Sequence, residues 1–280
     1  MLGVIFSLAA AVAYGAADFC GGLASRRTAI LAVVVLSQIV GLAVLLVCRP
    51  FLTTHATGTD YVWGALAGVC GGVGIALLYH ALSIGKMGVV SPITAVLAAA
   101  LPLVVGVARG EHLSALQGAG IGIALVAIIL ISISTEENGT REIATAGVRE
   151  AILSGIALGG FYICLAYPHR QAGLDPLLAA RITSVALLAL IGFIARTNFR
   201  AQRSSIALIV LGGALDMTAN ALYVLAAYAG YLSIAAVLTS LYPASTVFLA
   251  RVVLRERLAR SQWAGVALAL VGVALIAARV

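Results

Sequence analysis

Four ionisable side chains stand inside long apolar runs of the sequence, where bilayer-spanning helices would bury them. They are Asp18, His80, Arg181 and Asp216. A charged side chain at the centre of a bilayer costs roughly 2.5–3.5 kcal/mol on insertion scales, so such residues usually have a function. Side chains of these types can exchange protons, form ion pairs or hold a charged solute.

Asp216 belongs to the clearest polar stripe. Gly212, Asp216, Asn220 and Tyr223 follow one another at steps of four, four and three, which places them on one helix face. A polar stripe at the middle of a membrane faces a cavity or another helix, because contact with lipid is costly. We expect it to line a solute cavity. The alternative is a buried hydrogen-bonded contact that only holds helices together.

A second polar group is expected on the first apolar run, where Tyr14 and Asp18 are one helical turn apart. The run that carries His80 is parallel to this one, so Asp18 and His80 lie toward the same membrane side. They can pair, and His80 can titrate in the physiological range. The alternative is that each lies near enough to the interface to reach water.

Arg181 lies near the opposite membrane side, close in sequence to Asp175. Either it binds the solute, or its long stem lets the guanidinium reach the interface. The remaining cavity candidates are aromatic or hydroxyl residues: Tyr162, Thr239 and Tyr242. Pro243, beside the last of these, permits a kink in its helix.

Glu111 and Glu256 stand just before the fifth and the tenth apolar run. Ser114 and Gln117 have the spacing of a capping box. We therefore interpret the two glutamates as interface residues that help to start a helix, and not as catalytic groups.

Several kinds of functional motif are missing. The sequence has no Gly-rich loop ending in Lys-Ser or Lys-Thr, no metal ligands at helical spacing and no Ser-centred nucleophile motif. Its cysteines have neither metal-ligand nor disulfide-framework spacing. We expect no catalytic residue, no cofactor, no metal site and no ATP-driven pump.

The composition indicates an integral membrane protein. Hydrophobic residues make up 62% of the chain and charged residues 10%, whereas a soluble domain carries about 25% charge. The net charge of +7 resides mainly in arginines of short connections. We assign it to orientation in the lipid bilayer rather than to a nucleic-acid partner.

Ten apolar runs are long enough to cross a bilayer, which takes about 20 residues of helix. The first lacks the positive n-region of a signal peptide, so we keep it as a helix. A polar linker, residues 134–150, separates five runs from five. The predicted spans are 3–23, 30–47, 63–83, 89–107, 115–133, 151–167, 177–195, 206–228, 232–250 and 261–278.

The two groups of five runs, residues 1–133 and 151–280, are similar in sequence. The matched pairs are Glu111 with Glu256 and Gln117 with Gln262 at a shift of 145 positions, and Gly15 with Gly159 and Cys20 with Cys164 at a shift of 144. An odd number of spans inserts the second copy upside down. The sequence thus predicts an all-α protein of about ten transmembrane helices in two inverted five-helix repeats, an architecture typical of secondary transporters.

The end of each repeat resembles an EamA domain of the drug/metabolite transporter superfamily, in which an apolar helix with an internal Pro precedes Gly-Glu, a Gln and a Gly-rich helix. The first copy reads Arg109-Gly110-Glu111-His112-Leu113, then Gln117 and Gly120; the second reads Leu254-Arg255-Glu256-Arg257-Leu258, then Gln262 and Gly265. The opening Tyr14-Gly15-Ala16-Ala17-Asp18-Phe19 also resembles the start of such a domain. The chain departs from the family pattern in three places. Arg255 replaces a usual Gly, and Asp18 replaces a usually uncharged residue. The internal Pro243 has no partner at the equivalent Ala98, since the first copy carries Pro92 and Pro102 instead.

The resemblance implies a multi-pass protein of the cell membrane that exports or exchanges a small metabolite, amino acid or drug-like solute without ATP. A coupling proton or ion is compatible with it. A channel or structural component is the alternative, although a channel would show several polar faces forming a continuous pore. An intramembrane enzyme would need a paired acid and base or a metal cluster, and the sequence shows neither.

The basic residues lie mainly in the odd-numbered connections. Those hold Arg26, Arg27, Lys86, Arg141, Arg149, Arg196, Arg200, Arg203, Arg251, Arg255, Arg257 and Arg260, whereas the even-numbered connections and the tails hold Arg49, Arg109, Arg170 and Arg279. Lys and Arg are enriched on the cytoplasmic side. The distribution therefore favours both termini outside, while the family resemblance implies both inside.

Overall fold

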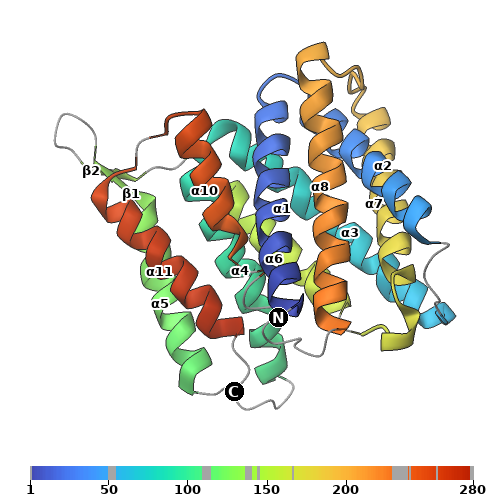
Figure 1. Cartoon of the computed structure of the whole chain (residues 1–280). Coiled ribbons are helices and arrows are strands. Elements are labelled where there is room, and N and C mark those ends of the chain that lie inside the picture. Colours follow the sequence, from blue (N-terminus) through green and yellow to red (C-terminus); the bar gives the residue numbers. More distant parts are fainter. Residues whose placement is uncertain are drawn as a thin grey trace.

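The structure is a computed structural model, and Figure 1 shows it as a bundle of long helices. It describes residues 2–49, 55–108, 115–135, 141–143, 146–165, 167–228, 239, 241–256 and 258–277. In these ranges the secondary structure is helical apart from one short hairpin. Each predicted span overlaps a described helix.

The first half of the chain forms α1 to α5. Their bounds are Leu2–Ser25, Ile30–Cys48, Gly58–Ile84, Met87–Ala108 and Ala115–Ser132. Helix α3 begins at Gly58 rather than at the predicted residue 63, because a capping box precedes it: the Thr57 hydroxyl and backbone N–H both donate to the Asp60 carboxylate, over 2.7 and 2.8 Å.

The second half forms α6, a short 3-10 turn η2, and then α7, α8, α10 and α11. Their bounds are Val148–Leu165, Arg170–Ala172, Asp175–Ile194, Arg203–Tyr228, Tyr242–Val253 and Arg260–Ala277. Pro243, interpreted above as a kink inside a longer span, stands in the first turn of α10. A proline there removes no helical hydrogen bond. Residues 232–238 and 240 of that predicted span lie outside the described residues.

The linker contains more structure than its polar composition predicts. Strands β1, Ile133–Thr135, and β2, Arg141–Ile143, pair antiparallel with Ile133 opposite Ile143. Helix α6 then begins at Val148, so the linker is shorter than the predicted 134–150.

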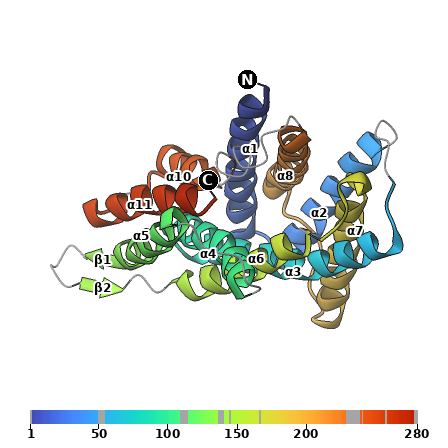
Figure 2. The same cartoon turned by 90° about the horizontal axis from the view of Figure 1, so that it is seen from below.

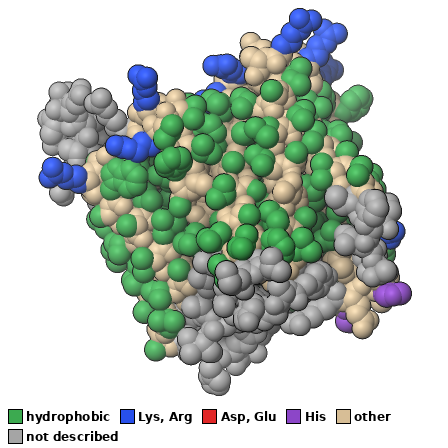
Figure 3. Space-filling view, in the orientation of Figure 1, with side chains coloured by type: hydrophobic (Ala, Val, Ile, Leu, Met, Phe, Trp, Pro, Cys, Tyr) green, Lys and Arg blue, Asp and Glu red, His purple; other side chains and the backbone are tan. Residues whose placement is uncertain are grey.

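The outer surface is apolar. Six described helices are long and apolar enough to cross a membrane: α1, α2, α3, α6, α7 and α8. Large apolar side chains point outward, such as Phe193, 80% exposed, and Ile194, 72% exposed. Figure 3 shows hydrophobic side chains across the middle of this face, with Lys and Arg gathered toward its upper and left edges. A contiguous apolar surface of this extent is suited to lipid.

Helices of the two halves alternate in the bundle. Helices α1 and α8 pack together, as do α3 and α6; α3 also packs on α7, as α8 does on α2. Helices α5 and α11 form a pair at one end of the molecule, and α2 and α7 lie at the other (Figures 1 and 2). The halves are therefore interleaved rather than separate.

Glycines bring the third helix of each half close to the second helix of the other half. A Cβ added at Gly68 on α3 would overlap the carbonyl oxygen of Ala180 on α7, and one at Gly213 on α8 would overlap that of Ser37 on α2. Small residues at such points let helix backbones approach closely. The pair α3 and α7 and the corresponding pair α8 and α2 thus each have a glycine at their close contact.

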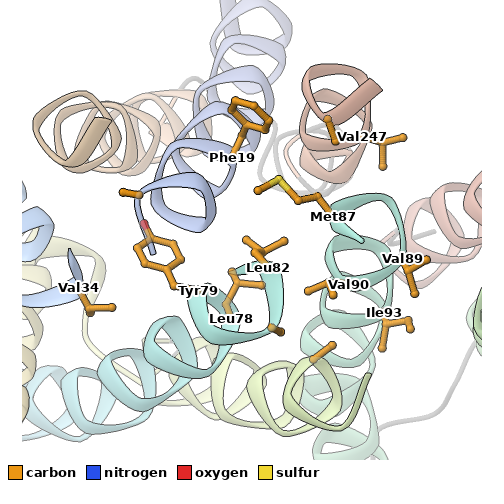
Figure 4. Close-up of a cluster of buried hydrophobic side chains, with 14 of the residues drawn as sticks. Phe19, Val34, Leu78, Tyr79, Leu82, Met87, Val89, Val90, Ile93 and Val247 are labelled. Atoms are coloured by element: carbon orange, nitrogen blue, oxygen red, sulfur yellow. The ribbon is translucent and has the colours of Figure 1, made fainter. Parts of the chain in front are cut away.

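The central apolar core lies beside these contacts. In Figure 4, Leu78 and Leu82 of α3 and Met87 and Val90 of α4 pack together, with Phe19 of α1 nearby. Burial of these side chains fixes α3 and α4 against α1. The same packing positions the helices that carry the polar residues described in the next subsection.

Candidate functional site: a polar cavity between the two halves

A cavity of about 70 Å³ lies between the halves, enough for a handful of water-sized molecules. Helices α1, α2, α3, α6, α7, α8 and α10 all contribute to its wall. Its polar lining consists of Tyr14, Asp18, Gln38, Tyr162, Arg181, Ser184, Asp216, Asn220 and Tyr242. Seven of the ten residues predicted from the sequence as cavity candidates are among them.

Arg181 and Asp216 form an ion pair at the centre of this wall. The Nη2 of Arg181 donates to Oδ2 of Asp216, and its Nη1 donates to Oε1 of Gln38. The hydroxyl of Ser184 donates to the same Gln38 oxygen over 3.3 Å. Arg181 therefore turns into the protein and does not extend to the interface. This network joins α2 of one half to α7 and α8 of the other.

Asp175, expected from its position in sequence to lie near Arg181, has different partners. It accepts two hydrogen bonds from Arg49, over 3.2 and 3.3 Å, and one from the hydroxyl of Tyr61, over 3.2 Å. The hydrogen bonds from Arg49 to Asp175 raise the pKa of the arginine above its ordinary value. Asp175 thus belongs to the end of the bundle and not to the cavity.

The polar stripe of α8 is only partly used by the cavity. Asp216 and Asn220 line it, and the Asn220 side-chain amide donates to the Asp216 backbone carbonyl over 2.7 Å. Tyr223, one turn further, is not among the lining residues. The Asp216 side chain keeps 21% exposure, so it faces both the ion pair and the cavity.

Asp18 lines the cavity and is 8% exposed. In the described part of the chain, no ion pair or hydrogen bond to its carboxylate is found, and His80 does not contact it. The geometry of α3 explains this: Tyr79, buried to 3% exposure, fills the contact with α1 at Gly21. His80 is one residue, about 100° of helix, further round.

Aromatic rings form the remaining wall. Tyr14 of α1 and Tyr242 of α10 meet edge to face, with centroids 6.4 Å apart. On the α6 side, Phe161 and Tyr162 do the same at 5.3 Å. Edge-to-face pairs of this kind hold rings in fixed orientations. Thr239 is not among the lining residues; its hydroxyl donates to the carbonyl of Ser7 over 3.4 Å.

Three further lining residues, Gln38, Ser184 and Phe161, were not predicted from the sequence. Gln38 stands in the middle of a strongly apolar run, but it carries no charge and has no other polar residue one turn away on its helix face, so the cost of burying an ion does not single it out. Ser184 is three residues after Arg181 and therefore on the same helix face. A polar residue of any kind at mid-span would have been the better signal.

Polar contacts between the halves lie at both ends of the bundle. At one end, besides the Asp175 cluster, Nδ1 of His169 lies 3.1 Å from Asp60 Oδ1, and the rings of Trp63 and Tyr167 stack 4.0 Å apart. These contacts tie α3 of the first half to the connection between α6 and α7.

At the other end, Glu256 binds the start of α4. Its carboxylate accepts the backbone N–H groups of Met87 and Gly88 over 3.2 and 3.3 Å, and Arg26 lies 3.6 Å away. Helix N-termini favour such anions. Glu256 therefore caps a helix of the opposite half, and not the following helix α11 as expected. Glu111 lies outside the described residues.

The unusual Arg255 has a structural consequence. Its φ is 54°, a left-handed conformation that glycine adopts at little cost and other residues adopt rarely. This explains why a glycine suits the position, and it directs the chain so that Glu256 reaches α4. Over the described ranges, no group of three His, Cys, Asp or Glu residues is placed to hold a metal ion.

A helical bundle with an apolar outer surface and a polar cavity shared by both halves is the architecture of a multi-pass membrane protein. The chain belongs to the EamA-like transporter family, whose model matches residues 1–133 and 146–278. The two matches correspond to the two halves described above.

Comparison with solved structures shows the same fold elsewhere. A crystal structure described only as that of a protein is similar to this chain with a TM-score of 0.59 and 15% sequence identity, over 95% of each chain. At that identity the likeness concerns the fold alone. No curated protein matches the sequence.

Proposed function

We propose that the protein is a secondary transporter of the cell membrane that exports or exchanges a small metabolite, amino acid or drug-like solute. Transport occurs by alternating access and without ATP. The observation that carries the proposal is the Arg181–Asp216 ion pair in a cavity lined by both halves. A charged site at the junction of two repeats is where secondary transporters hold their solute.

The proposal includes ten transmembrane helices in two inverted repeats. The helix contacts support it, because most of the major contacts between halves have a counterpart when the halves are exchanged, although the contact of α4 with α11 has no comparable one among the described residues. The contact of α1 with α8 corresponds to that of α6 with α3, the contact of α1 with α10 to that of α6 with α4, and α5 with α11 to itself. The glycine approaches at Gly68 and Gly213 correspond in the same way.

Alternating access requires contacts that close one end of the cavity while the other opens. The two inter-half clusters supply candidates, with Asp175 and Asp60 at one end and Glu256 at the other. Each consists of hydrogen bonds and ion pairs near helix ends, which break and re-form at less cost than buried apolar packing. In this proposal, solute release alternates between the two ends.

Counterflow in proteoliposomes tests the function. Purified protein is reconstituted without ATP, loaded with one unlabelled solute at a time from a panel of amino acids, nucleosides and organic amines, and offered the labelled form outside. A transporter accumulates label transiently and saturates with concentration. A channel equilibrates label without accumulation, and a structural protein or an intramembrane enzyme gives no flux.

A further inference from the structure

The charges that face the cavity do not balance. Two carboxylates, Asp18 and Asp216, and one guanidinium, Arg181, line it in the described part of the chain. Arg181 is bound to Asp216 and Gln38. Asp18, 92% buried by its 8% exposure, is thus left as a carboxylate without a cation.

Among the residues that the structure describes, no cation is placed to replace Arg181 beside Asp18. Asp216, Tyr79, Tyr162 and Tyr242 are close enough to interact with its charge, and none of these four carries a positive charge. The segment 224–240 is free of Lys, Arg and His. Asp18 is therefore either protonated, and then neutral, or ionised and paired with a cation from solution, which the solute can supply.

The same geometry disfavours an anionic solute. Both terminal nitrogens of Arg181 are already used by Asp216 and Gln38. Its remaining nitrogen, Nε, has no hydrogen-bond partner but is buried so completely that a ligand cannot touch it. A carboxylate could bind Arg181 only by breaking the ion pair with Asp216, which would leave a buried charge unpaired.

The aromatic lining favours a particular cation. Tyr14, Tyr162, Tyr242 and Phe161 line the cavity that Asp18 also lines, and the edge-to-face contact of Tyr14 with Tyr242 holds two of the rings. Aromatic faces attract alkylammonium groups by cation–π interaction. Gly71 and Gly72 of α3, with Leu158, add an apolar surface for the rest of the molecule.

We infer that the solute is a small monovalent organic cation, a protonated or quaternary amine on an apolar or aromatic body. Its nitrogen binds the Asp18 carboxylate among the tyrosine rings, and its body lies against α3 and α6. The inference rests on the proposed function and specifies its solute class. It attaches the substrate charge to Asp18, one of the residues at which this chain departs from the family pattern.

The test is equilibrium dialysis of the purified protein in detergent with labelled benzyltrimethylammonium, followed by competition. Unlabelled benzylamine should displace the label, whereas phenylacetate, an anion, and phenylalanine, a zwitterion, should displace it at concentrations about tenfold higher or more. This series needs no substitution, so it stands even if a variant fails to fold.

The variants are Asp18→Asn, Asp18→Glu and the control Glu150→Gln in the first turn of α6, away from the cavity. Asp18→Asn should weaken binding about 30-fold or more, because truncation of one member of a buried charge pair has an effect of that size. Asp18→Glu should restore much of the affinity, and Glu150→Gln should leave it unchanged. Stronger displacement by phenylalanine or phenylacetate, or unchanged binding in Asp18→Asn, overturns the inference.

Counterflow of the same label separates this inference from the proposed function. Binding that depends on Asp18 with no counterflow of any solute supports the cation site and contradicts the transporter. Counterflow of an amino acid that persists in Asp18→Asn supports the transporter and contradicts the cation site.

Discussion

Replacing Asp216 by asparagine would leave Arg181 buried without a counter-ion. The Arg181 side chain is 10% exposed, whereas that of Asp216 is 21% exposed. Loss of one member of a buried ion pair costs about 3–5 kcal/mol of the free energy of unfolding when no acceptor remains. Asparagine keeps an oxygen that can accept from Arg181, so we expect a loss of about 2–3 kcal/mol for Asp216→Asn.

The reverse substitution should cost less. Arg181→Met leaves Asp216 unpaired, but that carboxylate is more exposed to the cavity and water can solvate it. We expect a loss of about 1–2 kcal/mol, and a double variant that is more stable than the sum of the two losses by about 1–2 kcal/mol. Removing both charges leaves neither unpaired.

The assay is unfolding of the purified protein in mixed detergent micelles, followed by circular dichroism as the denaturing detergent is increased. Glu150→Gln is the control, because it removes a carboxylate outside the cavity, and it should change stability by less than about 0.5 kcal/mol. Losses that simply add in the double variant would refute the assigned ion pair, because two residues that do not interact give additive losses.

Three further predictions concern packing, the end of the bundle and orientation. Gly68→Ala should lower the free energy of unfolding by about 1–3 kcal/mol, because the added methyl group would overlap a backbone carbonyl. The control Gly58→Ala adds a methyl group in open space and should not lower it. Equal effects of the two variants would contradict the close approach of the helices. Glu256→Gln should lower the free energy of unfolding by about 1 kcal/mol in the same assay, because it weakens the cap at the start of α4. An unchanged free energy of unfolding would show that Glu256 does not cap α4. A reporter enzyme active only outside the cytoplasm should be active when fused after Val280 and inactive when inserted at Arg255; the opposite pattern would show that the family's orientation holds.

The helices could be predicted because each must present an apolar run to lipid, and such runs are visible in the sequence. Their ends were less visible, because capping sets them: Thr57 and Asp60 start α3 ahead of its apolar run. The small hairpin in the linker consists of only three residue pairs, from Ile133 opposite Ile143 to Thr135 opposite Arg141. The composition of the linker does not predict a pair of strands as short as β1 and β2.

The candidate site was predictable where charge identified it. Asp216, Asp18 and Arg181 were found because a charge in an apolar run is costly. Their partners depend on how helices from opposite halves meet, which sequence spacing does not show. Asp175 is closer than Asp216 to Arg181 in sequence, yet Arg181 pairs with Asp216, and Gln38 reaches it from a third helix.

The most direct test of the account is counterflow by wild-type protein and Asp216→Asn, compared at equal amounts of folded, reconstituted protein. The account predicts saturable accumulation of label by the wild type without ATP, and a rate at least about tenfold lower for the variant. Glu150→Gln should match the wild type. Equal rates for wild type and Asp216→Asn would contradict the claim that the cavity between the halves is where the solute binds.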